Sequence, residues 1–174
     1  MICGMNLDEL QRALGGIVLE SSYMERVLRA AFSSLMGSKY APAVDSHMST
    51  HNLIETCEQI AEVHTEISAD ARANLAAALK ACKAGNAKRN RVIHDAWALR
   101  PGDVVVTLKT VKTTQDVEVA ARTLPDLQRI ADDLGNAAGD LAAAVTATFG
   151  PEGMHVEDEL RLQPGHDISL DSGS

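Results

Sequence analysis

The stretch LDELQRALGGIVLESSYMERVLRAAFSSLM, residues 7–36, decides the fold. Its apolar residues recur at three- and four-residue spacing, which is the pattern of a helix with one buried face: Leu7, Leu10, Leu14, Ile17, Met24, Leu28 and Leu35. Gly37 is typical of a residue that stops a helix. We therefore expect a helix over residues 7–36, in which Gly15 and Gly16 are either a tolerated weak point or the mark of a kink or a close helix crossing.

Two more segments have the same helical period. One helix is predicted to begin at Thr50, after a loop at residues 38–49, and the next spans about 69–99. Hydrophobic residues make up 45% of the chain but aromatic residues only 3%, so the core must consist mainly of Ala, Leu, Val and Ile. Such a composition suits closely packed helices.

The period then changes from helical to extended. Residues 103–109 and 117–121 are β-branched runs separated by polar residues, and they predict a short hairpin. Thr123 with Asp126 forms a capping box that opens a last helix over about 124–148. The predicted fold class is all-α, an up-and-down four-helix bundle with a small β-hairpin inserted before the last helix.

Charge divides the chain into a body, residues 1–149, and an acidic tail, residues 150–174, which we expect to be flexible. The formal net charge of −8 argues against a protein with a generally basic, nucleic-acid-binding surface. Residues 80–94, however, carry five basic side chains and no acidic one. This stretch is a local basic stripe on an acidic protein.

Several other classes of protein are not indicated. No apolar run approaches the roughly 18 residues that a membrane helix needs, and the N-terminus has no basic leader. The three cysteines lack a CxxC pair, so neither a disulfide framework nor a zinc site is predicted. We expect a soluble, cytoplasmic protein with no cofactor and no metal.

The basic stripe ends in RNRVIH, residues 89–94, which places Arg89 and His94 five residues apart on a predicted helix. At about 100° per residue these two side chains project about 140° apart, so one copy could hardly converge both on one phosphate. Asn90 and His94 share a face, and Asn90 could orient the imidazole. Two copies meeting across a two-fold axis would place both pairs in one cleft.

This motif on the third helix of a bundle resembles the R-x4-6-H motif of the HEPN superfamily, in which a polar residue commonly follows the arginine. The resemblance implies a homodimer and, for many members, a metal-independent endoribonuclease of a toxin or of phage defence. It implies catalytic roles for Arg89 and His94 and a supporting role for Asn90. In one branch of the family, the residue two positions after the histidine is a tyrosine, and an antitoxin modifies it. This chain has Ala96 at that position. An antitoxin or a regulatory protein of another kind remains a possible partner.

The chemistry implied by the motif needs few groups. The RNA 2′-hydroxyl is the nucleophile, a histidine can serve as base or acid near neutral pH, and an arginine matches phosphate oxygens. The expected product is a 2′,3′-cyclic phosphate. The residues expected to bind RNA lie around the motif: Arg91, Lys88, Trp97 and Lys83.

Two alternatives remain open. The first is a non-catalytic HEPN-like homodimeric module for binding or assembly, which the low aromatic content favours because single-stranded RNA is usually held by stacking. The second is a metal site built from His47 and His51 with His64 or Glu55, and it is weak because His47 falls in a predicted loop.

Overall fold

The structure is a computed structural model that describes residues 7–94, 96–100, 104–110 and 117–154. The described part is mostly helical, in agreement with the predicted all-α composition. Its elements follow one another in this order: α1 (Leu7–Met36), α2 (Ala41–Asp45), α3 (Thr50–Val63), α4 (Ala69–His94), β1 (Ala96–Arg100), β2 (Val104–Thr110), β3 (Val117–Ala121), α5 (Leu124–Phe149) and the 3₁₀ turn η1 (Pro151–Met154).

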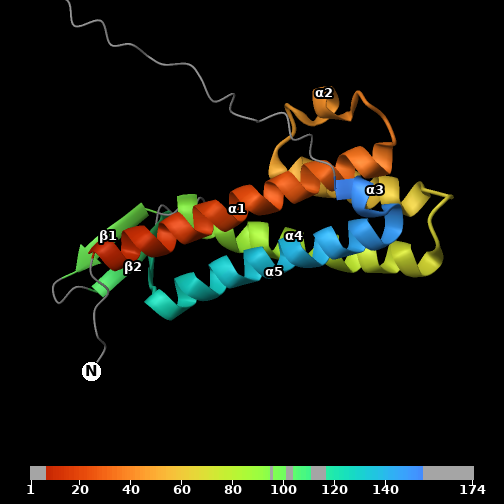
Figure 1. Cartoon of the computed structure of the whole chain (residues 1–174). Coiled ribbons are helices and arrows are strands. Elements are labelled where there is room, and N and C mark those ends of the chain that lie inside the picture. The colour runs from red at the N-terminus through yellow and green to blue at the C-terminus, as the bar shows by residue number, and fades with distance from the viewer. Residues whose placement is uncertain (1–6, 95, 101–103, 111–116, 155–174) are drawn as a thin grey trace, which may run out of the picture.

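The helix α5 runs beside both α1 and α4, while the shorter α3 lies beside only part of α1 and part of α4 (Figure 1). Residues from α1, α3, α4 and α5 form one buried cluster. Its largest fully buried side chains are aliphatic or Met, with Phe32 as the exception among the described residues. Closely packed Leu, Ile, Val and Ala side chains therefore fill a core that has few aromatic residues.

The helix α1 has the predicted bounds. It ends at Met36, and Gly37 follows with φ of +56°, a backbone conformation that glycine adopts without steric cost. Gly15 and Gly16 lie within this continuous helix, and a Cβ atom added at either would meet no atom of the chain within 4 Å. Neither glycine is therefore required by packing inside the described part of the chain.

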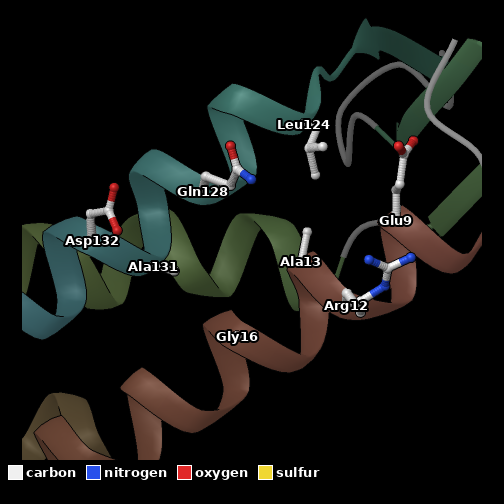
Figure 2. A pocket seen from close by; sticks show the side chains of 8 residues that line it. All are labelled: Glu9, Arg12, Ala13, Gly16, Leu124, Gln128, Ala131 and Asp132. Atoms are coloured by element: carbon white, nitrogen blue, oxygen red, sulfur yellow. The ribbon is translucent and has the colours of Figure 1, made fainter.

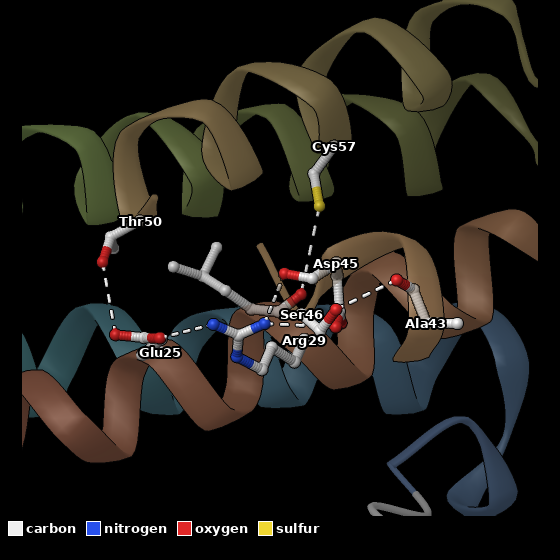
Figure 3. A network of polar contacts seen from close by, with 8 residues as sticks. Glu25, Arg29, Ala43, Asp45, Ser46, Thr50 and Cys57 are labelled. Carbon is white, nitrogen blue, oxygen red and sulfur yellow. Dashed lines mark hydrogen bonds and ion pairs between the residues drawn. The ribbon is translucent and has the colours of Figure 1, made fainter. Parts of the chain in front are cut away.

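The predicted loop at residues 38–49 contains a helix, α2, so that prediction is wrong in part. A polar network holds α2 against α1 (Figure 3). Arg29 donates to the backbone oxygen of Asp45 at 2.7 Å and to its carboxylate at 3.1 Å, and it also donates to Glu25 at 2.6 Å. The Asp45 side chain is buried, and so is Ala41, so a charge pair and one small apolar residue fix this segment, which has no repeated apolar pattern.

The helix predicted over 69–99 ends earlier, at His94, and this prediction is wrong for its last residues. The chain continues as β1, which pairs antiparallel with β2, and β2 pairs with β3, in the order β1-β2-β3. The reason is strand pairing: Trp97 lies opposite Thr107 of β2. Trp97 also donates its indole N–H to the backbone oxygen of Val92 at 2.9 Å, so it satisfies a carbonyl that the end of a helix leaves unpaired.

The last helix, α5, begins as predicted. The Thr123 hydroxyl accepts a hydrogen bond from the backbone N–H of Asp126, and the Asp126 carboxylate accepts one from the backbone N–H of Thr123. This reciprocal capping box satisfies two of the N–H groups that a helix start leaves free. The sheet and the starts of α1 and α5 lie at one end of the molecule (Figure 1).

Candidate functional site

The RNRVIH motif occupies the last turns of α4. The side chains of Arg89 and Asn90 are half-buried, whereas those of Arg91 and His94 are exposed. His94 is the final residue of the helix. The motif is therefore accessible at the end of the bundle where the sheet lies, and it is not sealed in the core.

Arg89 and Asn90 form a unit. The Nη1 atom of Arg89 donates to the Asn90 Oδ1 atom at 2.9 Å. The Arg89 Nε atom is buried and has no hydrogen-bond partner within the described residues. Asn90, which we expected to orient the imidazole of His94, instead holds the guanidinium of Arg89 through its side-chain oxygen. The polar residue that follows the arginine therefore orients Arg89.

Two residues of the motif lie on the side of α4 that faces α3. Lys83 marks this side, because its ammonium group donates to Glu55 at 3.2 Å and to Glu58 at 3.3 Å, both on α3. Asn90 lies seven residues after Lys83 and His94 four residues further, so all three project within about 40° around the helix. Asn90 and His94 therefore continue the side of α4 that α3 covers at Lys83.

The matching side of α1 is marked by Glu25, which accepts a hydrogen bond from Thr50 at 3.3 Å (Figure 3). Thr50 is the first residue of α3, so α3 does not extend further toward the start of α1. Val18 and Leu7 lie seven and eighteen residues before Glu25, on the same side of the helix, and they are 45% and 52% exposed.

Beyond the start of α3, this side of the bundle carries exposed residues in the described part of the chain, and we call it the uncovered face. Apolar residues of α1 and polar residues of α4 line it: Leu7, Val18, Asn90 and His94. An exposed apolar surface beside a group able to transfer protons is typical of a binding site or of an interface.

The residues expected to bind RNA are mostly engaged within the chain. Lys83 is held by α3, and hydrogen bonding with Glu55 raises its pKa. Lys88 donates to Asp133 of α5 at 2.7 Å. Trp97 lies in β1, is half-buried and donates to Val92, so it does not follow His94 on the same helix as we predicted. Of these four residues, Arg91 alone is exposed without a recorded partner in the described part of the chain.

A separate hollow of about 300 Å³ lies between α1 and α5 (Figure 2). Its polar lining consists of Glu9, Arg12, Gln128 and Asp132, and its floor consists of small or apolar residues. Sequence reasoning missed this hollow, and the lack of a side chain at Gly16 is the local feature that could have indicated it. It contains no residue of the motif.

The structure does not bring together the histidines of the alternative metal site. His51 lies 3.3 Å from Glu55, whereas His64 packs edge-on against the ring of Phe149. Among the described residues, no group of three or more His, Cys, Asp or Glu side chains could hold a metal ion. Within the same ranges, none of the helices combines the length and the hydropathy of a membrane-spanning segment.

Comparisons with protein-family models, with curated proteins and with solved structures find no match to this chain. The motif and the geometry of the uncovered face are therefore the features of this chain that bear on its function. The predicted acidic tail lies outside the described residues, apart from Gly150 and η1 at its start.

Proposed function

We propose that this chain is a HEPN-like, metal-independent endoribonuclease that acts as a homodimer. In this proposal the helices form a HEPN-like bundle, and two copies meet at the uncovered face, so that Arg89 and His94 of each copy border one cleft. The observation that supports it most directly is the exposure of His94 on the uncovered face, where Val18 and Leu7 of α1 are exposed as well and apolar side chains favour a partner.

The proposed reaction uses the nucleophile that RNA carries. One imidazole takes the proton of the 2′-hydroxyl as its oxygen forms a bond to phosphorus. The bond from phosphorus to the 5′-oxygen breaks, and the imidazole of the other copy gives a proton to that leaving oxygen. The guanidinium of Arg89 stabilises the charge on the phosphorane. The products are a 2′,3′-cyclic phosphate and a 5′-hydroxyl end.

Asn90 has a positioning role in this proposal. Its side-chain oxygen holds one Nη atom of Arg89 at 2.9 Å, which leaves Nη2 without a recorded partner among the described residues and free for a phosphate oxygen. A guanidinium held in this way loses less conformational entropy when it binds phosphate. Arg91, exposed on the same turn, would add attraction for the RNA backbone.

A second candidate function is a non-catalytic HEPN-like dimer for binding or assembly. The ion pairs of Lys83 and Lys88 favour it, since they neutralise much of the basic stripe. The position of Trp97 favours it too, because the indole is committed to the end of α4. For either function we also propose a role in a toxin system or in defence against phage, together with a regulatory partner. Both points rest on the family resemblance.

The test compares wild-type protein with His94→Ala on labelled RNA in the presence of EDTA. We expect the variant to lose at least 100-fold in cleavage rate, in line with loss of general acid–base catalysis. The control is His47→Ala, another exposed histidine, which should cleave like the wild type. Product ends are assigned by their resistance to phosphatase before acid opens the cyclic phosphate.

Three results would count against the proposal in different ways. Equal cleavage by wild type and His94→Ala would remove His94 from the reaction. Products with 3′-hydroxyl ends would overturn the mechanism. Binding of RNA without cleavage, by wild type and variant alike, would favour the binding module.

A further inference from the structure

The outward face of α1 has features that nothing in the described part of the chain explains. Leu19 is 72% exposed and points away from the core, because it lies about 160° around the helix from the buried Ile17. Gly15 lies one turn earlier on this same face, and a Cβ atom there would meet nothing within 4 Å. A glycine inside a helix costs about 1 kcal/mol relative to alanine, so its presence points to close contact with another molecule.

The charges on this face are arranged in a complementary way. Asp8 and Arg26 are eighteen residues apart, which is about five turns, so their side chains project in the same direction. Viewed down the helix axis, this direction lies between those of Gly15 and Leu19. Both are exposed, and neither has an ion pair in the described part of the chain. The acid stands near the start of α1 and the base nearer its end.

We propose that α1 packs antiparallel against α1 of a second copy of this chain, about a two-fold axis that passes near Ile17. In such a pair each residue faces the residue equally far from the axis on the other side. Leu19 of each copy then enters the space left by Gly15 of the other. Asp8 of each copy lies opposite Arg26 of the other, about 13 Å from the axis on either side.

The position of Gly15 and Leu19 fits this one arrangement. Both lie two residues from Ile17, so a single axis matches the large side chain with the missing one and also matches the acid with the base. A parallel pair would instead place Leu19 against Leu19 and Asp8 against Asp8. The chemistry of the face is therefore complementary to itself only in the antiparallel sense.

This contact does not depend on the proposed function, because it uses a different face of α1. Val18, on the uncovered face, lies about 100° around the helix from Leu19. Two separate two-fold contacts per chain would join dimers into a closed tetramer or an open chain of subunits. The two contacts can thus be removed one at a time.

The test measures self-association of the full chain by sedimentation equilibrium at micromolar concentration. Leu19→Arg and Gly15→Leu should each raise the dissociation constant of the α1 contact at least tenfold. Gly15→Leu should also raise the melting temperature of the dissociated chain, since leucine favours helix more than glycine does, and this shows that the loss is not a loss of folding. Matched controls that should have no effect on association are Val63→Arg, at a site 74% exposed on α3, and Gly139→Leu, at an open glycine on α5.

A charge exchange tests the direction of the pair. Asp8→Arg or Arg26→Asp alone should weaken association at least threefold, and the two together should restore it. Failure of the double variant to restore association overturns the antiparallel pair, and so does a chain that is monomeric, or one whose association is unchanged in Leu19→Arg. Association lost in Val18→Arg but kept in Leu19→Arg overturns this inference and leaves the dimer of the proposed function intact.

Discussion

Arg29 compensates a buried negative charge, and its removal should be costly. Asp45 is buried and receives two hydrogen bonds from Arg29, which links α1 to α2 (Figure 3). We expect Arg29→Met to lower the free energy of unfolding by about 3 kcal/mol, because it leaves a buried carboxylate without its partner. Urea denaturation measures this change.

The control for Arg29 is Arg129→Met. Arg129 forms an exposed pair with Asp126 at 3.4 Å, and exposed pairs contribute at most about 1 kcal/mol. Equal losses for the two variants would show that burial of Asp45 adds nothing to the stability of the fold.

Cys57 and Cys82 should resist alkylation. Burial is the main reason that the pKa of each thiol is raised to about 12, and the thiolate is the reactive form. In a Cys3→Ser background at pH 8, we expect labelling by iodoacetamide at least 100-fold slower in the folded chain than in urea. Fast labelling without denaturant would show that the core around α3 and α4 opens readily.

The motif illustrates how far single residues can be read from sequence. The separate directions of Arg89 and His94 follow from helical spacing. The bond between Arg89 and Asn90 does not, because an amide can reach a neighbour on either side and only the packing around α4 selects one. The partners of Lys83 and Lys88 lie 25 or more residues away in the chain, so local spacing could not reveal them.

Among the helices, α5 offers the clearest test of an element. Thr123→Ala removes the hydroxyl that caps α5, and it should lower the free energy of unfolding at pH 7 by about 1 kcal/mol. The exposed Thr146→Ala, in the interior of α5, should be neutral or slightly stabilising. Thermal denaturation of both variants makes the comparison.

The same cap should be sensitive to acid. The hydrogen bond from the Thr123 hydroxyl is the first cause that holds the pKa of Asp126 below its usual value. A lowered pKa gives stabilisation that is present above the unfolded value of about 3.9 and is lost as the pH falls through the folded value. The difference in stability between wild type and Thr123→Ala should therefore shrink below about pH 4. A constant difference down to pH 2 would contradict the role of the carboxylate.

Element boundaries were predictable where they depend on local chemistry. The stop at Gly37 and the capping box of α5 need only neighbouring residues, and both were predicted correctly. The end of α4 was not, because Ile93 and Trp97 fit a helical stripe as well as a strand, and pairing with β2 decides between them. The short α2 has too few residues to show a period, and it is held by Arg29 from another helix.

On the scale of the whole molecule, a shared cleft has a quantitative signature. If both imidazoles are needed, as proposed, activity should fall with the square of the wild-type fraction when wild-type and His94→Ala chains are mixed and allowed to exchange. An equal mixture should then keep about a quarter of the activity, and not half. A linear fall would mean that each chain cleaves RNA without its partner.

The shortness of α3 divides the molecule into two unequal halves. One half has a fourth helix and the Arg29 network, while the other relies on three helices and a small sheet at its end (Figure 1). Amide protons near the start of α1 and the end of α4 should therefore exchange with solvent sooner than those near Cys57, because fewer contacts oppose local opening there. A molecule that binds to the uncovered face would slow that exchange, because it would add contacts that oppose local opening at this end of the bundle.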